Sequence, residues 1–248
     1  MGPNAHRPFP PRGFTLVELL VVVGIIALLI GILMPALNAA RSQALTIKCA
    51  SNLHDIGRAM QQYAIEHKGK IPRGYHYDFW YRRGHILWAE ALSRHLNRPI
   101  EVADLTQARD RVLAAHFLTM DVYQCPAFPN DRQALDYVSN SWMGGGGTDD
   151  ASIVLTRLKR SSEVVFLTEA NARALTDQFC YHDVWEPAHL PTFPNSPQPN
   201  PSARVLNDKR HRGRINILFL DGHVATRTHF REVQQKDFDY LWFDLRRP

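Results

Sequence analysis

The feature that most constrains this chain is an apolar segment close to its N-terminus. Residues 14–37 make 24 positions with a single charged side chain, Glu18. A helix of this length extends for about 36 Å at about 1.5 Å per residue, which is enough to cross a bilayer. A carboxylate inside lipid is costly and requires a partner, so an ordinary membrane anchor leaves Glu18 unexplained.

A secretory signal peptide is the first alternative to a membrane anchor. Such a peptide has a shorter apolar core, followed by a cleavage site made of small residues. Here the apolar core is too long, and no Ala-x-Ala sequence occurs between Gly24 and Leu45. Gly13 instead stands directly before the apolar segment, at its boundary with the charged residues.

The sequence Gly-Phe-Thr-Leu-Val-Glu-Leu-Leu at residues 13–20 resembles the processing signal of type IV prepilins and type II secretion pseudopilins. The resemblance implies that a prepilin peptidase cuts between Gly13 and Phe14 and that Phe14 is then methylated. Glu18 becomes the fifth residue of the mature protein, and its implied partner is the Phe14 amine of a neighbouring subunit. Pro35 falls where such pilins kink their N-terminal helix.

Length and composition predict one soluble domain behind the apolar segment. We expect a leader at residues 1–13, the transmembrane half of a helix at 14–37, and a soluble head at 38–248. The head has roughly 200 residues, enough for one sizeable core. Hydrophobic residues make up 45% and charged residues 21%, which is a globular balance.

The charges that flank the apolar segment predict its orientation. Arg7 and Arg12 precede it, which predicts a cytoplasmic N-terminus, and the resemblance to prepilins implies that the membrane is a bacterial inner membrane. The head then lies outside the cytoplasm, where disulfides are permitted. The net charge of +5 is mild, and the basic cluster at residues 209–214 is more simply a solvated turn than a nucleic-acid site. Nucleic acid is therefore not an expected partner.

A one-sided apolar stripe continues the N-terminal helix beyond the membrane segment. Its members recur at intervals of three or four residues, which is typical of an amphipathic helix: Leu45, Cys49, Leu53, Ile56, Met60 and Tyr63. We expect one helix from Phe14 to about His67, running through Pro35, with Gly69 as its C-cap and Pro72 as its stop. The predicted fold is α+β and pilin-like, with this long helix packed on a small, mainly antiparallel sheet.

Shorter patterns predict the elements of the head. Helices are expected at residues 86–97 and 103–118, and strands at 122–126, 137–142 and 164–167, the last as a central strand. Six prolines lie between residues 186 and 202, which predicts an extended surface loop. Residues 214–227 contain an Asp-Gly pair between two β-rich runs, which predicts a hairpin.

A second resemblance lies at this hairpin. His211 is followed by nine residues and then by Asp221 and Gly222, which resembles the C-terminal motif of a large group of prepilin-type proteins. The Cys-Ala-Ser-Asn-Leu sequence at residues 49–53 and the Cys-Pro pair at 125–126 also resemble positions in that group.

The ligand types of this motif raise the question of a metal site. His211, Asp221 and His223 could all bind a metal. A two-residue turn at Asp221 and Gly222 would, however, place His211 near Glu232, about 33 Å from the turn. We therefore predict no metal site and no cofactor. Asp221 and Gly222 are expected to form a positive-φ turn, and His211 to mark the start of the strand.

The chain has three cysteines without metal-type spacing: Cys49, Cys125 and Cys180. Cys49 lies on the apolar stripe, and Cys125 ends a predicted strand that should pack near it. We expect these two to be close enough for a disulfide or a buried contact, with Cys180 free. Three pairings exist, and the sequence does not choose between them.

No catalytic motif accompanies these features. Gly-x-Ser-x-Gly, His-Glu-x-x-His and Cys-x-x-Cys are all absent, and Glu169 follows an apolar strand without an evident partner. The chain is therefore predicted not to be an enzyme.

The resemblance implies a structural pseudopilin that assembles with other pilin subunits into the pilus-like filament of a type II secretion machine. One alternative is a minor type IV pilin for adhesion or DNA uptake, slightly favoured by the basic cluster. Another is a membrane-tethered binding module that does not assemble.

Overall fold

The computed structural model describes residues 14–72, 88–100, 108–128, 134–140, 154–158, 160–171, 184–185 and 210–228. The chain divides after Arg41 into two units, which are described separately. The predicted leader with Gly13, the loop predicted at residues 186–202 and Cys180 lie outside the described residues.

One long helix, α1, runs from Leu16 to Glu66 and has Pro35 inside it. This confirms the helix expected between Phe14 and His67. At its end Lys68 and Gly69 both take positive φ, 58° and 82°, and the Gly69 N–H donates to the carbonyl of Ala64 at 2.7 Å. The left-handed end of the helix therefore involves Lys68 as well as the predicted Gly69.

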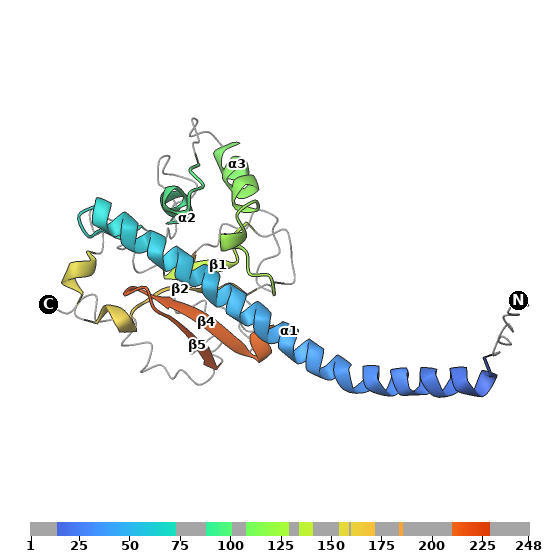
Figure 1. Ribbon diagram of the computed structural model, residues 1–248. Coiled ribbons are helices and arrows are strands. Elements are labelled where there is room, and N and C mark those ends of the chain that lie inside the picture. Colours follow the sequence, from blue (N-terminus) through green and yellow to red (C-terminus); the bar gives the residue numbers. More distant parts are fainter. Residues whose placement is uncertain are drawn as a thin grey trace, which may run out of the picture. The chain divides into compact units, whose positions relative to one another are not determined.

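Five strands form one sheet in the order β3-β1-β2-β4-β5. They are β1 (Tyr137–Asn140), β2 (Val165–Glu169), β3 (Val184–Trp185), β4 (Arg214–Phe219) and β5 (Val224–Thr228). The β1–β2, β2–β4 and β4–β5 pairs are antiparallel, and β3 joins β1 in parallel. Every residue of the central strand β2 is buried. These features confirm the predicted α+β fold with a mainly antiparallel sheet (Figure 1).

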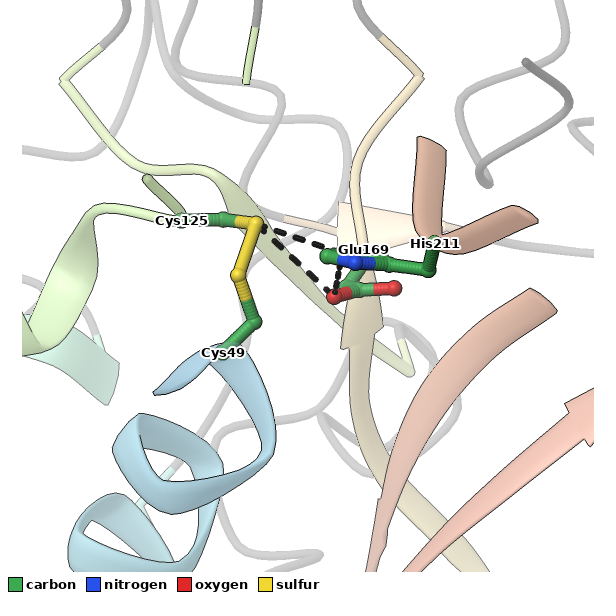
Figure 2. Close-up of side chains that lie close together, drawn as sticks. All are labelled: Cys49, Cys125, Glu169 and His211. Carbon is green, nitrogen blue, oxygen red and sulfur yellow. Dashed lines mark hydrogen bonds and ion pairs between the residues drawn. A yellow bond between two sulfur atoms is a disulfide. The ribbon is translucent and has the colours of Figure 1, made fainter. Parts of the chain in front are cut away.

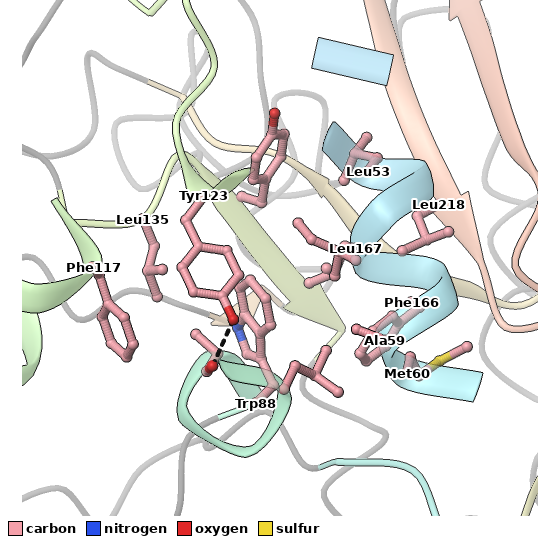
Figure 3. Close-up of a cluster of buried hydrophobic side chains, with 14 of the residues drawn as sticks. Leu53, Ala59, Met60, Trp88, Phe117, Tyr123, Leu135, Phe166, Leu167 and Leu218 are labelled. Carbon is pink, nitrogen blue, oxygen red and sulfur yellow. Dashed lines mark hydrogen bonds between the residues drawn. The ribbon is translucent and has the colours of Figure 1, made fainter. Parts of the chain in front are cut away.

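The segment of α1 beyond Ser42 packs on this sheet. Cys49, Leu53, Ile56 and Met60 of the predicted stripe are fully buried. Figure 3 shows apolar side chains of α1 beside those of β2 and β4 in one cluster. Burial of each large apolar side chain stabilises the fold by about 1.5–3 kcal/mol, so this stripe holds the helix on the sheet.

Short helices cover the aromatic end of the core. They are α2 (Trp88–Ser93), η1 (Arg94–Leu96) and α3 (Ala108–Phe117), with single turns at η4 (Leu155–Arg157) and η5 (Ser161–Glu163). The ring of Tyr123 makes edge-to-face contacts with Trp88 and Phe117, at centroid distances of 5.4 and 5.6 Å. Its hydroxyl donates to the carbonyl of Ala89 at 2.6 Å, and burial raises the pKa of Tyr123 (Figure 3).

The prediction of a strand at residues 122–126 is wrong. This stretch begins with a 3-10 turn, η2 (Asp121–Tyr123), and its backbone groups bond within local turns, to the Asp136 N–H and to side chains, not along a strand ladder. Asn52 Nδ2 donates to the carbonyls of Asp121 and Gln124, at 3.0 and 2.8 Å. The Cys125 N–H donates to the Asp136 carboxylate at 2.7 Å. Nothing in the local sequence reveals these distant partners.

Candidate functional site

The first candidate site is the start of α1. Thr15 and Glu18 form a reciprocal capping arrangement: the Glu18 N–H donates to Thr15 Oγ1 at 3.2 Å. The Thr15 N–H and hydroxyl both donate to Glu18 Oε2, at 2.8 and 2.7 Å. A Thr-x-x-Glu pair of this kind satisfies free N–H groups at a helix start. Glu18 thus has a local partner that the sequence analysis missed, although the spacing to Thr15 is the signal for it.

The apolar half of α1 is exposed throughout. Every residue from 14 to 41 is exposed, although most of these side chains are apolar. Among the described residues, α1 is the one helix long and apolar enough to cross a membrane. Pro35 lies in this half without ending the helix; a kink at Pro35 stays a prediction.

The second candidate site is a buried polar cluster in the head. Cys49 of α1 forms a disulfide with Cys125, which follows η2, and their Cα atoms are 5.1 Å apart. His211 Nε2 lies 3.4 Å from Cys125 Sγ and 2.8 Å from Glu169 Oε1. Figure 2 shows the imidazole ring and the carboxylate both directed toward the Cys125 sulfur. All four side chains are buried, so the cluster has no exposed face.

Backbone geometry aims His211 into this cluster. His211 lies in the short turn η7 (Arg210–Arg212), directly before β4. His211 and Arg212 take positive φ of 50° and 60°, and Gly213 follows at 76°. A left-handed conformation is unfavourable for residues other than glycine and persists only where surrounding contacts hold it. The buried contacts of the imidazole ring stabilise this left-handed conformation at His211.

Three further side chains support Glu169 and His211, directly or through one another. Asn216 of β4 donates its backbone N–H to Glu169 Oε2 at 2.9 Å and its Nδ2 to Oε1 at 3.0 Å. Thr226 of β5 donates its hydroxyl to Asn216 Oδ1 at 2.7 Å, which fixes the orientation of the amide. His211 Nδ1 lies 3.0 Å from Thr46 Oγ1, so the ring is held from α1 as well.

Asp136 adds a second buried acid beside Cys125. Burial raises the pKa of Asp136 to about 8, against the hydrogen bond from the Cys125 N–H and the nearby charge of Arg210, which both lower it. Glu169 raises this pKa further. Arg210 is itself buried and donates to the carbonyl of Ala170.

The Asp-Gly turn lies at the far end of β4. Gly222 has φ of 90° and its N–H donates to the Phe219 carbonyl at 2.9 Å. Leu218 pairs with Val224, so the predicted two-residue register is wrong by one position. Gly222 takes the expected positive φ, whereas Asp221 does not. Asp221 Oδ1 instead accepts from the His223 N–H at 3.0 Å, which closes the turn.

The turn docks on α1 at a different place from His211. Gln61 Nε2 donates to the Asp221 carbonyl at 2.6 Å, and a Cβ placed on Gly57 would lie 3.3 Å from the Gly222 carbonyl oxygen. Gln61 and Thr46 are about 22 Å apart along the helix, at about 1.5 Å per residue. The nine residues between His211 and Asp221 thus separate two docking points along α1.

The structure therefore divides the predicted site residues into separate groups. Cys49, Cys125 and His211 meet in one cluster, whereas Asp221 and Gly222 form the distant turn. Glu169, for which the sequence showed no partner, is the residue that joins the cluster. Thr46 and Asn216 were missed because neither carries a sequence signal. The cluster can crosslink segments and hold protons or a cation, but it has no opening for a substrate.

Comparisons with known proteins agree with the N-terminal resemblance. The family described as "Prokaryotic N-terminal methylation motif" matches residues 11–34. The chain is 42% identical over 55 residues to the type IV wide pilus major component PilA4 of Thermus thermophilus. That match covers 22% of this chain and 42% of the relative's length. No solved structure matches.

These matches confirm the predicted resemblance to type IV pilins, and neither is to an enzyme. Together with the apolar helix, the motif indicates a membrane-anchored protein.

Proposed function

Because the chain is type IV pilin-like, we propose that it is a structural subunit of a pilus-like filament. The observation that carries this proposal is the first half of α1, which is apolar on all sides and exposed in the single chain. Leu16 and Leu20, for example, are 78% and 67% exposed. A helix that is apolar all round requires lipid or other helices around it. Before assembly, lipid surrounds the apolar half of α1. After assembly, the corresponding helices of neighbouring subunits surround it.

Processing prepares this helix for assembly. In our proposal, prepilin peptidase cuts between Gly13 and Phe14 in the bacterial inner membrane, with the N-terminus cytoplasmic and the head outside. The Phe14 amine of one subunit then pairs with Glu18 of the next. This pairing competes with the local cap from Thr15, so Glu18 has one partner in the free subunit and another in the filament.

Two machines could use such a filament. The resemblance at residues 13–20 is common to type IV prepilins and type II secretion pseudopilins, and the matched relative is a wide pilus component, which supports a pilus. Deletion of the gene followed by separate assays of surface pili and of exported proteins distinguishes them. Loss of pili alone supports a type IV pilus, and loss of export alone supports a type II secretion machine.

The basic cluster at residues 209–214 gives little support to DNA uptake. Arg210 and His211 are buried, at 8% and 3% exposed, and only Arg212 and Arg214 of the described members are exposed. The interpretation of this cluster as a wholly solvated turn is wrong, because His211 and Arg210 face the core. The remaining charge is small for a phosphate-binding surface.

The processing step is tested by mass spectrometry of the protein purified from membranes. We expect a mature N-terminus at methylated Phe14. Gly13→Asp should leave the full-length precursor, because a bulky charged side chain cannot replace glycine at the cleavage position. Gly2→Asp introduces the same change elsewhere in the leader and should be processed normally. A wild-type chain that starts at Met1 would contradict the proposal.

The assembly step is tested at Glu18. Glu18→Gln retains a side chain that can cap the helix but removes the charge, whereas Thr15→Val removes the capping hydroxyl and keeps the charge. We expect Glu18→Gln and Glu18→Leu to give processed, inserted protein that is missing from sheared filaments. Thr15→Val should still assemble. Normal incorporation of the Glu18→Gln protein into filaments would mean that Glu18 acts only as a helix cap.

A further inference from the structure

The buried cluster contains four side chains of types that can bind metals: Cys49, Cys125, Glu169 and His211. One ligand atom from each lies within 4.8 Å of the other three. We propose that, when the disulfide is reduced, the two thiolates, Glu169 Oε1 and His211 Nε2 form a closed four-ligand site for Zn²⁺. This inference concerns the head alone and does not depend on filament assembly.

The distances around Cys125 already suit a tetrahedral site. Zinc bonds of about 2.3 Å to sulfur and about 2.0–2.2 Å to nitrogen or oxygen give ligand separations of about 3.4–3.8 Å. Cys125 Sγ is 3.4 Å from His211 Nε2 and 3.9 Å from Glu169 Oε1. The 2.8 Å between His211 Nε2 and Glu169 Oε1 has to widen by about 0.6 Å. The two sulfur atoms separate once the bond between them is reduced.

Hydrogen bonding orients the correct nitrogen of His211 toward the site. His211 Nδ1 lies 3.0 Å from Thr46 Oγ1, on the side of the ring away from the cluster. His211 Nε2 faces Glu169 Oε1 at 2.8 Å. In the disulfide form a hydrogen atom lies between these two atoms, and in the reduced form a metal ion can take its place.

The surroundings of the ligands are those of a structural metal site. Asn216 holds both oxygens of Glu169, and Thr46 holds the outer nitrogen of His211. Such outer contacts fix ligand orientation around metals. The two sulfurs and the imidazole favour zinc over calcium or magnesium, which prefer oxygen ligands. Because all four ligands come from the buried protein, no position remains open for a substrate, and the site is structural.

Exchange of the disulfide for a metal ion begins with reduction. A dithiol or phosphine reductant supplies two electrons to the disulfide, and two protons complete the Cys49 and Cys125 thiols. Zn²⁺ then displaces the two thiol protons, and any hydrogen on His211 Nε2 moves to Nδ1 or to solvent, so at least two protons are released for each ion. The bound site carries one net negative charge, which the buried Arg210 beside His211 offsets. Oxidation of the two thiolates reverses the sequence and expels the ion.

The consequence is an alternative crosslink for the reduced chain. The disulfide joins only Cys49 of α1 to Cys125. A metal ion would tie the same two segments to β2 through Glu169 and to η7 through His211. The two crosslinks exclude each other, because both use the same sulfur atoms.

The test uses the full chain in detergent micelles with Cys180→Ser, so that Cys49 and Cys125 are the only thiols. The chain is reduced with a phosphine and titrated with Co²⁺, an optical probe for zinc sites. We expect one equivalent to bind, with thiolate-to-cobalt charge-transfer absorption and tetrahedral d–d bands that Zn²⁺ abolishes. Zn²⁺ binding in weak buffer should release at least the two thiol protons. The oxidised chain should show no such bands.

Ligand variants and matched controls complete the test. His211→Gln and Glu169→Gln should each weaken Co²⁺ binding by at least about tenfold. His223→Gln and Glu163→Gln change a histidine and a glutamate outside the cluster and should bind as the parent does. Circular dichroism checks folding of each variant. If a variant does not fold, the bands and proton count of the parent chain still decide. A folded, reduced parent without charge-transfer bands, or folded variants with unchanged affinity, would overturn the proposal.

Discussion

The two halves of α1 share one helical backbone and meet opposite surroundings. Residues 14–41 are exposed throughout, with Leu and Val on every side, whereas the half beyond Ser42 buries one stripe in the core of the head. The described contacts of the first half are those of its cap at Thr15 and Glu18. The second half places Asn52, Gly57 and Gln61 against particular backbone groups.

This difference shows what each half demands of its residues. Lipid and neighbouring apolar helices accept many apolar side chains, because their attraction is not directional. A folded core is packed closely, so each position has to match a particular neighbour in shape and hydrogen bonding. Equal substitutions should therefore have unequal effects on the two halves.

The largest effect is expected at Asn52. Asn52→Ala removes both donors to the Asp121 and Gln124 carbonyls, and should lower the free energy of unfolding by about 2–4 kcal/mol. Asn38→Ala, the same change in the exposed half, should alter it by less than about 0.5 kcal/mol. Chemical denaturation of the detergent-solubilised chain, followed by tryptophan fluorescence, measures both. Equal losses at the two positions would remove the distinction between the halves.

A smaller effect is expected at Gly57. A Cβ at this position would lie 2.8 Å from Leu218 Cδ1 and 3.3 Å from the Gly222 carbonyl oxygen. The strain of about 1–3 kcal/mol exceeds the gain of about 1 kcal/mol from replacing a helical glycine by alanine, so Gly57→Ala should lower stability by about 1 kcal/mol. At Gly31 nothing lies within 4 Å of such a Cβ, and Gly31→Ala should leave the unfolding of the head unchanged. A Gly57→Ala protein more stable than the wild type would show that Leu218 and the turn at Gly222 move aside at little cost in free energy.

The last effect lies outside α1 and is a dependence of stability on pH, not a loss at one pH; it concerns Asp136, an acid buried in the core beside Cys125. The pKa of Asp136 is about 8 in the folded protein and near its ordinary value of 3.8 in the unfolded chain. Between these values the folded state holds a proton that the unfolded state has lost. This contribution to the free energy of unfolding therefore falls as pH rises, by at most about 1.4 kcal/mol per pH unit.

Asp136→Asn should remove this slope between about pH 4 and pH 8, and denaturation curves across that range measure it. Asp121→Asn changes an exposed aspartate in the same region and should keep the wild-type slope. An unchanged slope in Asp136→Asn would mean that Asp136 is ionised in the fold.

Much of the architecture follows from local sequence patterns. The apolar run, the stripe from Leu45 to Tyr63 and the two β-rich runs around Asp221 each have a period that dictates one element, so the long helix and the β4–β5 hairpin were predictable. The N-terminal motif likewise carries its own information, because residues 13–20 are contiguous. Thr15 and Glu18 are close neighbours on one helical turn, and their capping contact was readable from that spacing alone.

Only the tertiary structure decides which distant residues meet. Glu169, Asn216 and Thr46 are ordinary residues in their local contexts, and their importance arises because β2, β4 and α1 converge on His211. Distant contacts also explain why residues 122–126 do not form a strand, since local turns and the side chains of Asn52 and Asp136 take hydrogen bonds that a neighbouring strand would provide. Periodicity encodes which face of an element is buried, but not which partner covers it, because that depends on contacts between residues far apart in the chain.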